Sequence, residues 1–457
     1  MSVRSRLFVS LRKGTLSISL IPIPFLLLEQ LSHATMSTQA HIHVIKKANI
    51  GEHKTVPITT TLPALHDGHV RFRSVVVSLT SNNLTYAQMG SMLKWWDMYP
   101  VQSELPSPFN DQDTYGIVPV WGYGEVLESK VAGLEPRMLV WGFWPTTDLA
   151  VDLKLDPAGV EGHWIETSDF RKDVQTMYKR FILRDVGARL ASLDQSKYEQ
   201  MAWESACRPI WEAGYLLSHA IFGEAHAHPA NAGPWTEADA DLTSAVVISL
   251  SASGKTPRAF TEALVHRGPS EGPLGFLAIT STVKSSLCPK AAFPTKIVEY
   301  ANMADNETME WIQAQRPKKI VIADFGGRGD SLFRLHEALV QHLSGIEIMV
   351  MGVGGNPDMR TADDLGQWAQ RNNGSKSFDR IQMNTTEVRD VMMERDGAGK
   401  YFEGLDAAWD RYRQSSVVSD MKLQLGKGID GDEGFEGGWT RICDGWLPSD
   451  VAQAYTV

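Results

Sequence analysis

Short apolar runs recur through the second half of the chain and alternate with segments of helical spacing. Helical spacing is clearest over residues 306–315 and 331–343. Five apolar runs have the length and composition of buried strands, and they cover residues 245–250, 274–280, 296–300, 319–323 and 346–353. Strands that alternate with helices predict a parallel, doubly wound α/β sheet with both faces covered.

The first half of the chain shows a different pattern of short strands with glycines at the bends. Residues 71–83 alternate and are β-branched, residues 115–129 suggest two strands on either side of a glycine-pinched crossing, and residues 138–153 add another. This pattern predicts a small, distorted β-barrel. Core packing is the expected role of the five tryptophans in or beside these strands, which are Trp95, Trp96, Trp121, Trp141 and Trp144.

Two further patterns lie near the C-terminus. Residues 385–413 have helical spacing, and the glycine-rich residues 426–438 are expected to form an exposed loop.

The passage from the strand at residues 245–250 into a helix opened by Pro257 is the main candidate for a binding site. Free N–H groups and the helix dipole favour an anion at such a helix N-terminus. A P-loop is one interpretation, because Gly254, Lys255 and Thr256 fit the end of that motif. Its first glycine is missing, however, since Ser249 stands at that position inside the strand.

A dinucleotide site is the other interpretation of this turn, although only Gly254 of its three fingerprint glycines is in place. In the P-loop interpretation, Asp324 would instead be a metal-holding aspartate. For a dinucleotide, the expected pyrophosphate-binding residues are Ser251, Ala252, Ser253, Gly254, Lys255 and Thr256.

The segment after the second strand bears on the choice of cofactor. An NAD site usually has an acidic residue there for the ribose 2′-hydroxyl. Between Thr280 and Lys290 this chain has no acidic residue, and Thr282, Lys284 and Ser285 instead suit a 2′-phosphate. The sequence therefore favours NADP over NAD. The alternative interpretation is an ordinary polar loop with a solvated lysine.

Length and composition narrow the classes of function. A chain of 457 residues suggests two or three domains, and a formal charge of −10 argues against nucleic acid or an anionic membrane as the main partner. Three scattered cysteines provide neither a disulfide framework nor a zinc ribbon. His219, His226 and His228 form a local cluster that we interpret as a surface loop rather than a metal site.

Residues 1–35 have the layout of a secretory leader, with basic residues before an apolar run at 16–28. That run is too short and too broken by proline for stable membrane insertion. Met36 offers a second start, so an over-extended gene model or a dispensable leader is expected, and a cytoplasmic location with it. A secretory location is the alternative if residues 1–34 act as a signal peptide.

Residues 119–145 resemble the barrel signature of the medium-chain dehydrogenase/reductase superfamily. Residues 79–90, the pair Trp95 and Trp96, and residues 323–339 resemble more closely the DUF2855 family of such proteins. The resemblance implies a GroES-like barrel joined to a Rossmann domain, with the active site in the cleft between them. It gives expected domains at 36–215 (barrel), 216–370 (nucleotide binding) and 371–457 (a C-terminal segment that returns to the barrel).

The resemblance also implies site residues. Zinc-dependent members use a cysteine and Gly-His-Glu, whereas residues 122–125 here contain neither histidine nor cysteine, so no metal is expected. In the segment that lines the cleft, Tyr86 is the candidate proton donor and Asn83 the candidate donor to the substrate oxygen. The alternative is that Asn83 caps a turn and Tyr86 packs under it.

These features together predict a zinc-independent, NADP(H)-linked reductase or dehydrogenase. It would transfer hydride to or from a carbonyl or activated alkene of a small organic substrate. The superfamily resemblance adds a homodimer to the expectations. A non-catalytic scaffold is the alternative, because side chains at Ala252 and Ser253 would crowd a pyrophosphate. A P-loop phosphotransferase is the third hypothesis.

Overall fold

The computed structural model describes residues 6–12, 15–21, 37–184, 193–223, 235–353, 380–446 and 448–457. The chain forms two compact units, one of residues 1–39 with 59–64 and one of residues 40–58 with 65–457. In the first unit, β1 (Arg6–Arg12) pairs antiparallel with β2 (Thr15–Ile21). The barrel and the parallel sheet belong to the second unit. His226, His228 and most of the expected leader lie outside the described residues.

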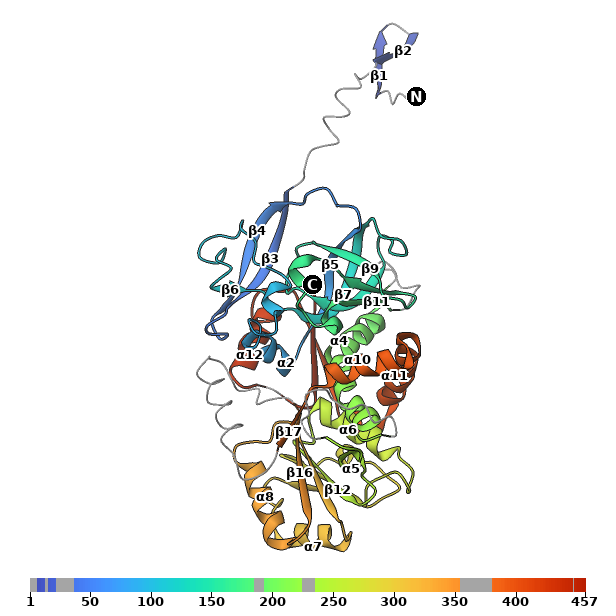
Figure 1. The fold of residues 1–457 in the computed structure, drawn as a ribbon. Helices are drawn as coiled ribbons and strands as arrows, with labels where there is room; N and C mark the ends of the chain where they lie inside the picture. Colours follow the sequence, from blue (N-terminus) through green and yellow to red (C-terminus); the bar gives the residue numbers. More distant parts are fainter. Residues whose placement is uncertain are drawn as a thin grey trace. The chain divides into compact units, whose positions relative to one another are not determined.

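Six of the described strands close a barrel (Figure 1). Each pairs antiparallel with the next in the order β5, β7, β8, β11, β10 and β9, and β9 pairs again with β5. The rings of Phe72, Trp144 and Phe181 pack inside the barrel and are fully buried. The strands are β5 (His69–Leu79), β7 (Val120–Ser129), β8 (Leu139–Trp144), β9 (Val151–Pro157), β10 (His163–Glu166) and β11 (Arg180–Leu183).

The glycines of β7 permit close packing and do not mark a crossing between two strands. A Cβ at Gly122 would overlap the carbonyl oxygen of Val76 on β5, and a Cβ at Gly124 would overlap the Trp144 ring. The expected pair of strands over residues 115–129 is therefore a short β6 (Tyr115–Gly116) and one continuous β7. β6 joins β3 (Ser37–Lys46) and β4 (His53–Thr61) in a separate sheet.

The second half of the chain forms the predicted parallel sheet, in the order β14, β13, β12, β15, β16, β17. Counted along the chain from β12, this is the order 3-2-1-4-5-6 of a Rossmann fold. The strands are β12 (Ala245–Leu250), β13 (Gly275–Thr280), β14 (Thr295–Glu299), β15 (Lys319–Asp324), β16 (Glu347–Val353) and β17 (Arg380–Met383). The predicted doubly wound fold is confirmed.

Helices cover both faces of this sheet. α7 (Asn306–Ala314) and α8 (Ser331–His342) pack through Ile312 and Leu335 on the apolar cluster of one face (Figure 1). On the other, α4 (Gln195–Leu216) packs against α6 (Lys255–Val265), where a Cβ at Gly214 would overlap the carbonyl oxygen of Thr256. α4 ends at Leu216, the residue at which the nucleotide-binding domain was expected to begin.

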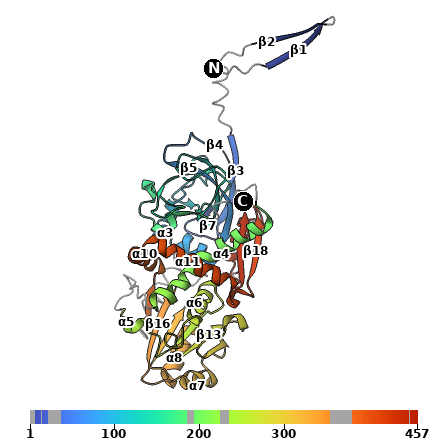
Figure 2. The same ribbon diagram turned by 90° about the vertical axis from the view of Figure 1, so that its right-hand side faces the viewer.

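The C-terminal segment returns to the barrel, as the superfamily resemblance implies. After α10 (Thr385–Asp396) and α11 (Ala398–Gln414), β18 (Lys422–Lys427) pairs with β19 (Val451–Thr456). β19 pairs antiparallel with β5, which places the end of the chain at the barrel (Figures 1 and 2).

The exposed loop expected over residues 426–438 is only partly present. α12 (Phe435–Cys443) begins inside it, with Phe435 fully buried, because Gly438 lets the helix pack directly on Tyr455. The short helices are α2 (Ser81–Gln88), α3 (Thr176–Lys179) and α5 (Glu237–Ala240). Within the described ranges, none of the helices is both long enough and apolar enough to cross a membrane.

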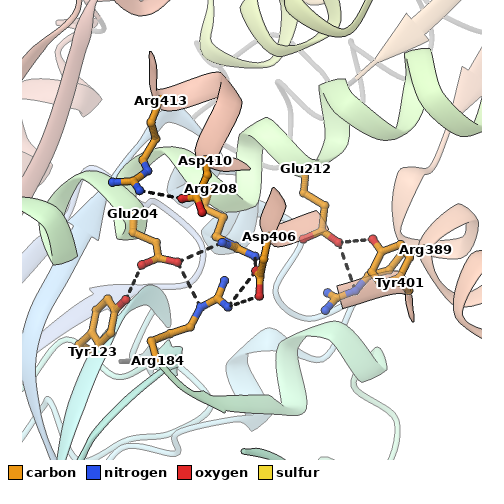
Figure 3. Close-up of polar contacts among 10 residues, drawn as sticks. All are labelled: Tyr123, Arg184, Glu204, Arg208, Glu212, Arg389, Tyr401, Asp406, Asp410 and Arg413. Atoms are coloured by element: carbon orange, nitrogen blue, oxygen red, sulfur yellow. Dashed lines mark hydrogen bonds and ion pairs between the residues drawn. The ribbon is translucent and has the colours of Figure 1, made fainter. Parts of the chain in front are cut away.

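Two buried glutamates on α4 bind partners from the barrel and from α10 and α11 (Figure 3). Glu204 accepts a hydrogen bond from the Tyr123 hydroxyl at 2.5 Å and pairs with Arg208 and Arg184 at 3.3 and 3.2 Å. Two turns along the helix, Glu212 accepts one from Tyr401 at 2.6 Å and pairs with Arg389 at 3.3 Å. These contacts fix the helix that supports α6.

Candidate active site

A cleft of about 830 Å³ brings the carboxyl ends of the parallel strands together with α2 beside the barrel. Its described lining includes Tyr86 on α2, the turn after β12, Ser281 after β13, Tyr300 after β14 and the loop 325–329 after β15. Seven described residues that precede or begin the last strand of the chain also line it, and they are Ile442, Gly445, Trp446, Pro448, Ser449, Val451 and Gln453. Ligands bind at this edge in open α/β sheets, where the strand order reverses between β12 and β15.

The turn after β12 begins with a serine at a position where the backbone conformation favours glycine. Ser251 adopts a left-handed backbone conformation with φ of 68°, which a residue with a side chain rarely takes. Its hydroxyl donates to the carbonyl oxygen of Gly326 at 2.8 Å and lies 2.7 Å from the Tyr300 hydroxyl. The tight turn that a glycine normally provides is thus held by hydrogen bonds from two neighbouring loops.

Gly254 is the N-cap of α6, and Lys255, Thr256 and Pro257 of the first turn line the cleft with it. The N–H groups of Lys255 and Thr256 have no acceptor within the helix, whereas Pro257 has no N–H. Of the other residues expected at the pyrophosphate, Ser251, Ser253, Lys255 and Thr256 line the cleft with it. Ala252 is buried and donates its N–H to the carbonyl oxygen of Ile279 at 2.8 Å. This hydrogen bond attaches the turn to the end of β13. α6 begins at Lys255, two residues before Pro257.

A fully buried arginine holds this turn in place. Arg258 donates from Nε to the carbonyl oxygen of Ser253 at 2.9 Å, and its guanidinium binds both carboxylate oxygens of Asp420 at 2.7 and 3.0 Å. Burial opposes ionisation of Asp420, but hydrogen bonds from Arg258, Ser286 and Lys284 hold its pKa below the usual range. Sequence reasoning missed this pair, because its two members are 162 residues apart.

Lys284 does not face the cleft as a free cation. Its ammonium group lies 2.7 Å from Asp450 and 2.9 Å from Asp420, and it is not among the described residues that line the cleft. The sequence around Lys284 has no acidic residue, but the fold brings two carboxylates to it from the C-terminal segment. Thr282 and Ser285 are exposed and also absent from the described lining, whereas their neighbour Ser281 belongs to it.

Lys255 and Arg328 are the cations of the described cleft lining, and that lining contains no aspartate or glutamate. Neither cation forms an ion pair with a described residue. Burial lowers the pKa of Lys255 from its ordinary value. A cleft with unpaired cations and a helix N-terminus has the electrostatics of a site for phosphate groups.

At the α2 end of the cleft, the structure separates the two candidate catalytic residues. Asn83 is buried, and its side-chain oxygen accepts from the backbone N–H of Thr80 at 2.7 Å and from its hydroxyl at 3.2 Å. It therefore caps α2, as in the alternative interpretation, and is not among the described residues that line the cleft. The preceding residue, Asn82, does line it.

Tyr86 lines the cleft with its hydroxyl inside a set of hydrogen-bond partners. Trp121 donates from Nε1 to this hydroxyl at 3.2 Å, and Asn82 and Tyr178 also hydrogen-bond to it. Burial raises the pKa of Tyr86, although these three hydrogen bonds act in the opposite direction. The phenol is thus protonated at neutral pH, and donors are in place to stabilise the phenolate that remains after proton transfer.

Two carboxylates outside the described cleft lining, Glu125 and Asp324, both have charged partners. Glu125, in the segment aligned with the zinc site of the superfamily, is buried and pairs with Arg73 at 3.0 Å. Asp324 accepts from the N–H groups of Gly326 and Gly327 at 3.1 and 2.7 Å and pairs with Arg380 at 3.1 Å. Among the described residues, no group of three or more His, Cys, Asp and Glu side chains is placed to hold a metal ion.

A GroES-like barrel joined to a Rossmann sheet, with a cleft at the strand ends, defines a protein with the fold of the medium-chain dehydrogenase/reductase superfamily. The chain belongs to the family described as protein of unknown function DUF2855, whose model matches residues 77–448.

Similar solved structures agree with this fold. A mutant form of the enoyl thioester reductase from Candida tropicalis has 11% sequence identity and a TM-score of 0.51, and the match covers 92% of this chain and 100% of that one. A complex of Etr1p with NADP and crotonyl-CoA has 13% identity and a TM-score of 0.50, with the same coverage. No curated protein matches the sequence.

Proposed function

We propose that this protein is an NADP(H)-linked reductase or dehydrogenase that transfers hydride to or from a carbonyl or activated alkene of a small organic substrate. The observation that carries the proposal is the cleft itself. It combines a turn into a helix N-terminus and two cations, neither of which pairs with a described residue, with a buried phenol on α2.

The charge of the cleft supports a dinucleotide. The whole chain has ten more acidic than basic residues, 54 against 44, yet no described residue of the lining is acidic. The first turn of α6, with Gly254 and Lys255, would hold the pyrophosphate. Ser251 and Ser253 place side chains beside Gly254, but all three residues border the open cleft. One structural neighbour, Etr1p, is described in a complex with NADP.

The proposed roles in the reaction follow from position. A bound nicotinamide cofactor supplies or accepts the hydride. When hydride adds to one atom of the substrate double bond, Tyr86 donates its phenolic proton to the other atom. Trp121, Asn82 and Tyr178 then stabilise the phenolate by hydrogen bonds until solvent restores the proton. No step requires a metal, so we keep zinc independence as part of the proposal.

The two alternative hypotheses fit the geometry less well. A scaffold that has lost nucleotide affinity predicts a crowded turn after Leu250, whereas Ser251, Ser253 and Gly254 border an open cleft. A P-loop phosphotransferase needs a carboxylate for its metal, but the Asp324 carboxylate is occupied by two backbone N–H groups and Arg380.

Fluorescence titration of the full-length protein with NADPH tests the proposal, with NADH and magnesium ATP titrated in parallel. We expect saturable NADPH binding, followed by NADPH oxidation with one or more members of a panel of enones and aldehydes. No saturable NADPH binding in the low-millimolar range would reject the proposal. Saturable ATP binding that requires magnesium and is lost in Lys255→Ala would favour the phosphotransferase instead.

The proposed homodimer is a separate question. Sedimentation velocity of the purified full-length protein would measure its mass in solution. A monomer at all concentrations would remove the dimer without affecting the proposed reaction.

A further inference from the structure

We infer that Arg328, and not Lys284, recognises the 2′-phosphate of the cofactor and sets the preference for NADP(H) over NAD(H). This inference rests on the proposed function, because it assigns a residue to one phosphate of the proposed ligand. It differs from the sequence-based expectation, which placed the 2′-phosphate on Thr282, Lys284 and Ser285.

The position of Arg328 is the first argument. The backbone N–H of Arg328 donates to the hydroxyl of Tyr300, and that hydroxyl lies 2.7 Å from Ser251. These contacts join the loops that follow β15, β14 and β12 around the carboxyl end of β13. In a Rossmann fold the adenosine ribose lies at the end of this second strand. Arg328 therefore belongs to the part of the cleft where the 2′-phosphate would lie.

Charge is the second argument. A 2′-phosphate carries nearly two negative charges and needs a cation near it. Lys255 lies in the first turn of α6 and is assigned to the pyrophosphate, which leaves Arg328 as the remaining cation of the described lining. Lys284 is already neutralised by Asp420 and Asp450, so binding a phosphate there would require breaking two ion pairs.

The loop that carries Arg328 has a fixed base and an exposed tip. Asp324 accepts from the N–H groups of Gly326 and Gly327, and a Cβ at Gly327 would overlap the Leu250 side chain. Gly326 and Gly329 take left-handed conformations with φ of 97° and 54°. Arg328 lies between these glycines with its side chain exposed and without an ion pair to a described residue, so its planar guanidinium is free to bind a phosphate with two hydrogen bonds.

The test compares dissociation constants for NADPH and NADH in three variants of the full-length protein, each checked for folding by circular dichroism. Arg328→Ala should weaken NADPH binding by about tenfold to a hundredfold, the loss expected for a charge-assisted contact, and change NADH binding by less than about twofold. Arg334→Ala removes an exposed arginine of α8 that is outside the described cleft lining and should change neither constant.

Lys284→Met decides between the two assignments. It should leave the ratio of the NADPH and NADH dissociation constants unchanged, even if both rise because Asp420 also holds Arg258. The inference is overturned if Arg328→Ala leaves this ratio unchanged, or if Lys284→Met lowers the NADPH preference by as much. A wild-type protein that binds neither dinucleotide would reject the proposed function, and the inference with it, whereas wild-type binding with an unaffected Arg328→Ala rejects the inference alone.

Discussion

The hydroxyl groups of Ser251 and Tyr300 lie 2.7 Å apart, and this contact links the turn after β12 to the loop after β14. Ser251 also donates to Gly326 in the loop after β15, so one side chain ties together three loops around the proposed cofactor site. The same residue has a left-handed backbone, which costs an L-residue about 1–2 kcal/mol. The turn is therefore strained at a place where its shape matters for the ligand.

Two substitutions at Ser251 should separate the contributions of backbone strain and of hydrogen bonds to the free energy of unfolding. Ser251→Ala loses two hydrogen bonds and keeps the left-handed conformation, so we expect a loss of about 1–3 kcal/mol in the free energy of unfolding. Ser251→Gly loses the same bonds but relieves the strain, and it should be more stable than Ser251→Ala by about 1 kcal/mol. Urea denaturation measures both. A glycine variant less stable than the alanine variant would contradict this account of the turn.

The fold was largely predictable because apolar periodicity is a local signal. All five predicted strands of the second half appear in the parallel sheet, and the ranges predicted in the first half overlap β5, β7, β8 and the start of β9 in the barrel. The barrel strands β10 and β11 were not predicted. β17 was missed, since residues 380–383 contain two polar side chains and lie at the edge of the sheet. The buried start of α12 was missed because glycines that permit close packing resemble glycines of a loop.

The site was less predictable, because its contacts connect distant parts of the chain. No acidic residue lies near Lys284 in the sequence, but in the fold Asp420 and Asp450 of the C-terminal segment pair with it. Within α2 the helical period decides which residue faces the cleft. Tyr86 faces it and Asn83 caps the helix, a distinction that requires the register of α2 to be known.

Replacement of Tyr86 by phenylalanine should impair proton transfer and leave cofactor binding intact. The variant keeps the ring, which packs against Trp95 and Phe143, and removes only the hydroxyl. We expect the NADPH dissociation constant to stay within about twofold and kcat to fall by about a hundredfold to ten-thousandfold with any substrate found in the enone and aldehyde panel. Equal kcat values for the two proteins would exclude Tyr86 as the proton donor.

Asp420 should make the folded state sensitive to acid. Its folded pKa is below the ordinary value of about 3.9, so its stabilising effect is fully present above that pH and is lost as the pH falls toward the folded pKa. At neutral pH, Asp420→Asn should therefore unfold at a lower urea concentration than the wild type, because buried Arg258 loses its charged partner. The difference between the two midpoints should shrink below a pH of about 4. A difference that stays constant across this range would show that the charge of Asp420 has no such role.

The ion pair between Glu212 on α4 and Arg389 on α10 should be essential to the stability of the folded protein (Figure 3). Both side chains are buried, so Glu212→Leu leaves an uncompensated guanidinium and should lower the free energy of unfolding by about 3–5 kcal/mol. Glu52 provides the contrast, because its pair with Lys46 is exposed to solvent. Glu52→Ala should leave the urea midpoint nearly unchanged. Similar midpoints for the two variants would contradict the importance of the buried pair.

Cofactor affinity should fall at alkaline pH through loss of the Lys255 proton. Burial lowers the pKa of this lysine below its ordinary value of about 10.4, and a bound pyrophosphate stabilises only the protonated form. The NADPH dissociation constant should therefore rise as the pH increases from about 7 toward 10. The neighbouring thiol of Cys207 does not account for such a change, because burial raises its pKa to about 12. Lys255→Met should bind NADPH more weakly and lose this pH dependence. Lys255→Arg should keep the affinity for NADPH into the alkaline range. The control variant Lys290→Met removes an exposed lysine outside the described cleft lining and should behave as the wild type. An unchanged pH dependence in Lys255→Met would remove Lys255 from the pyrophosphate site.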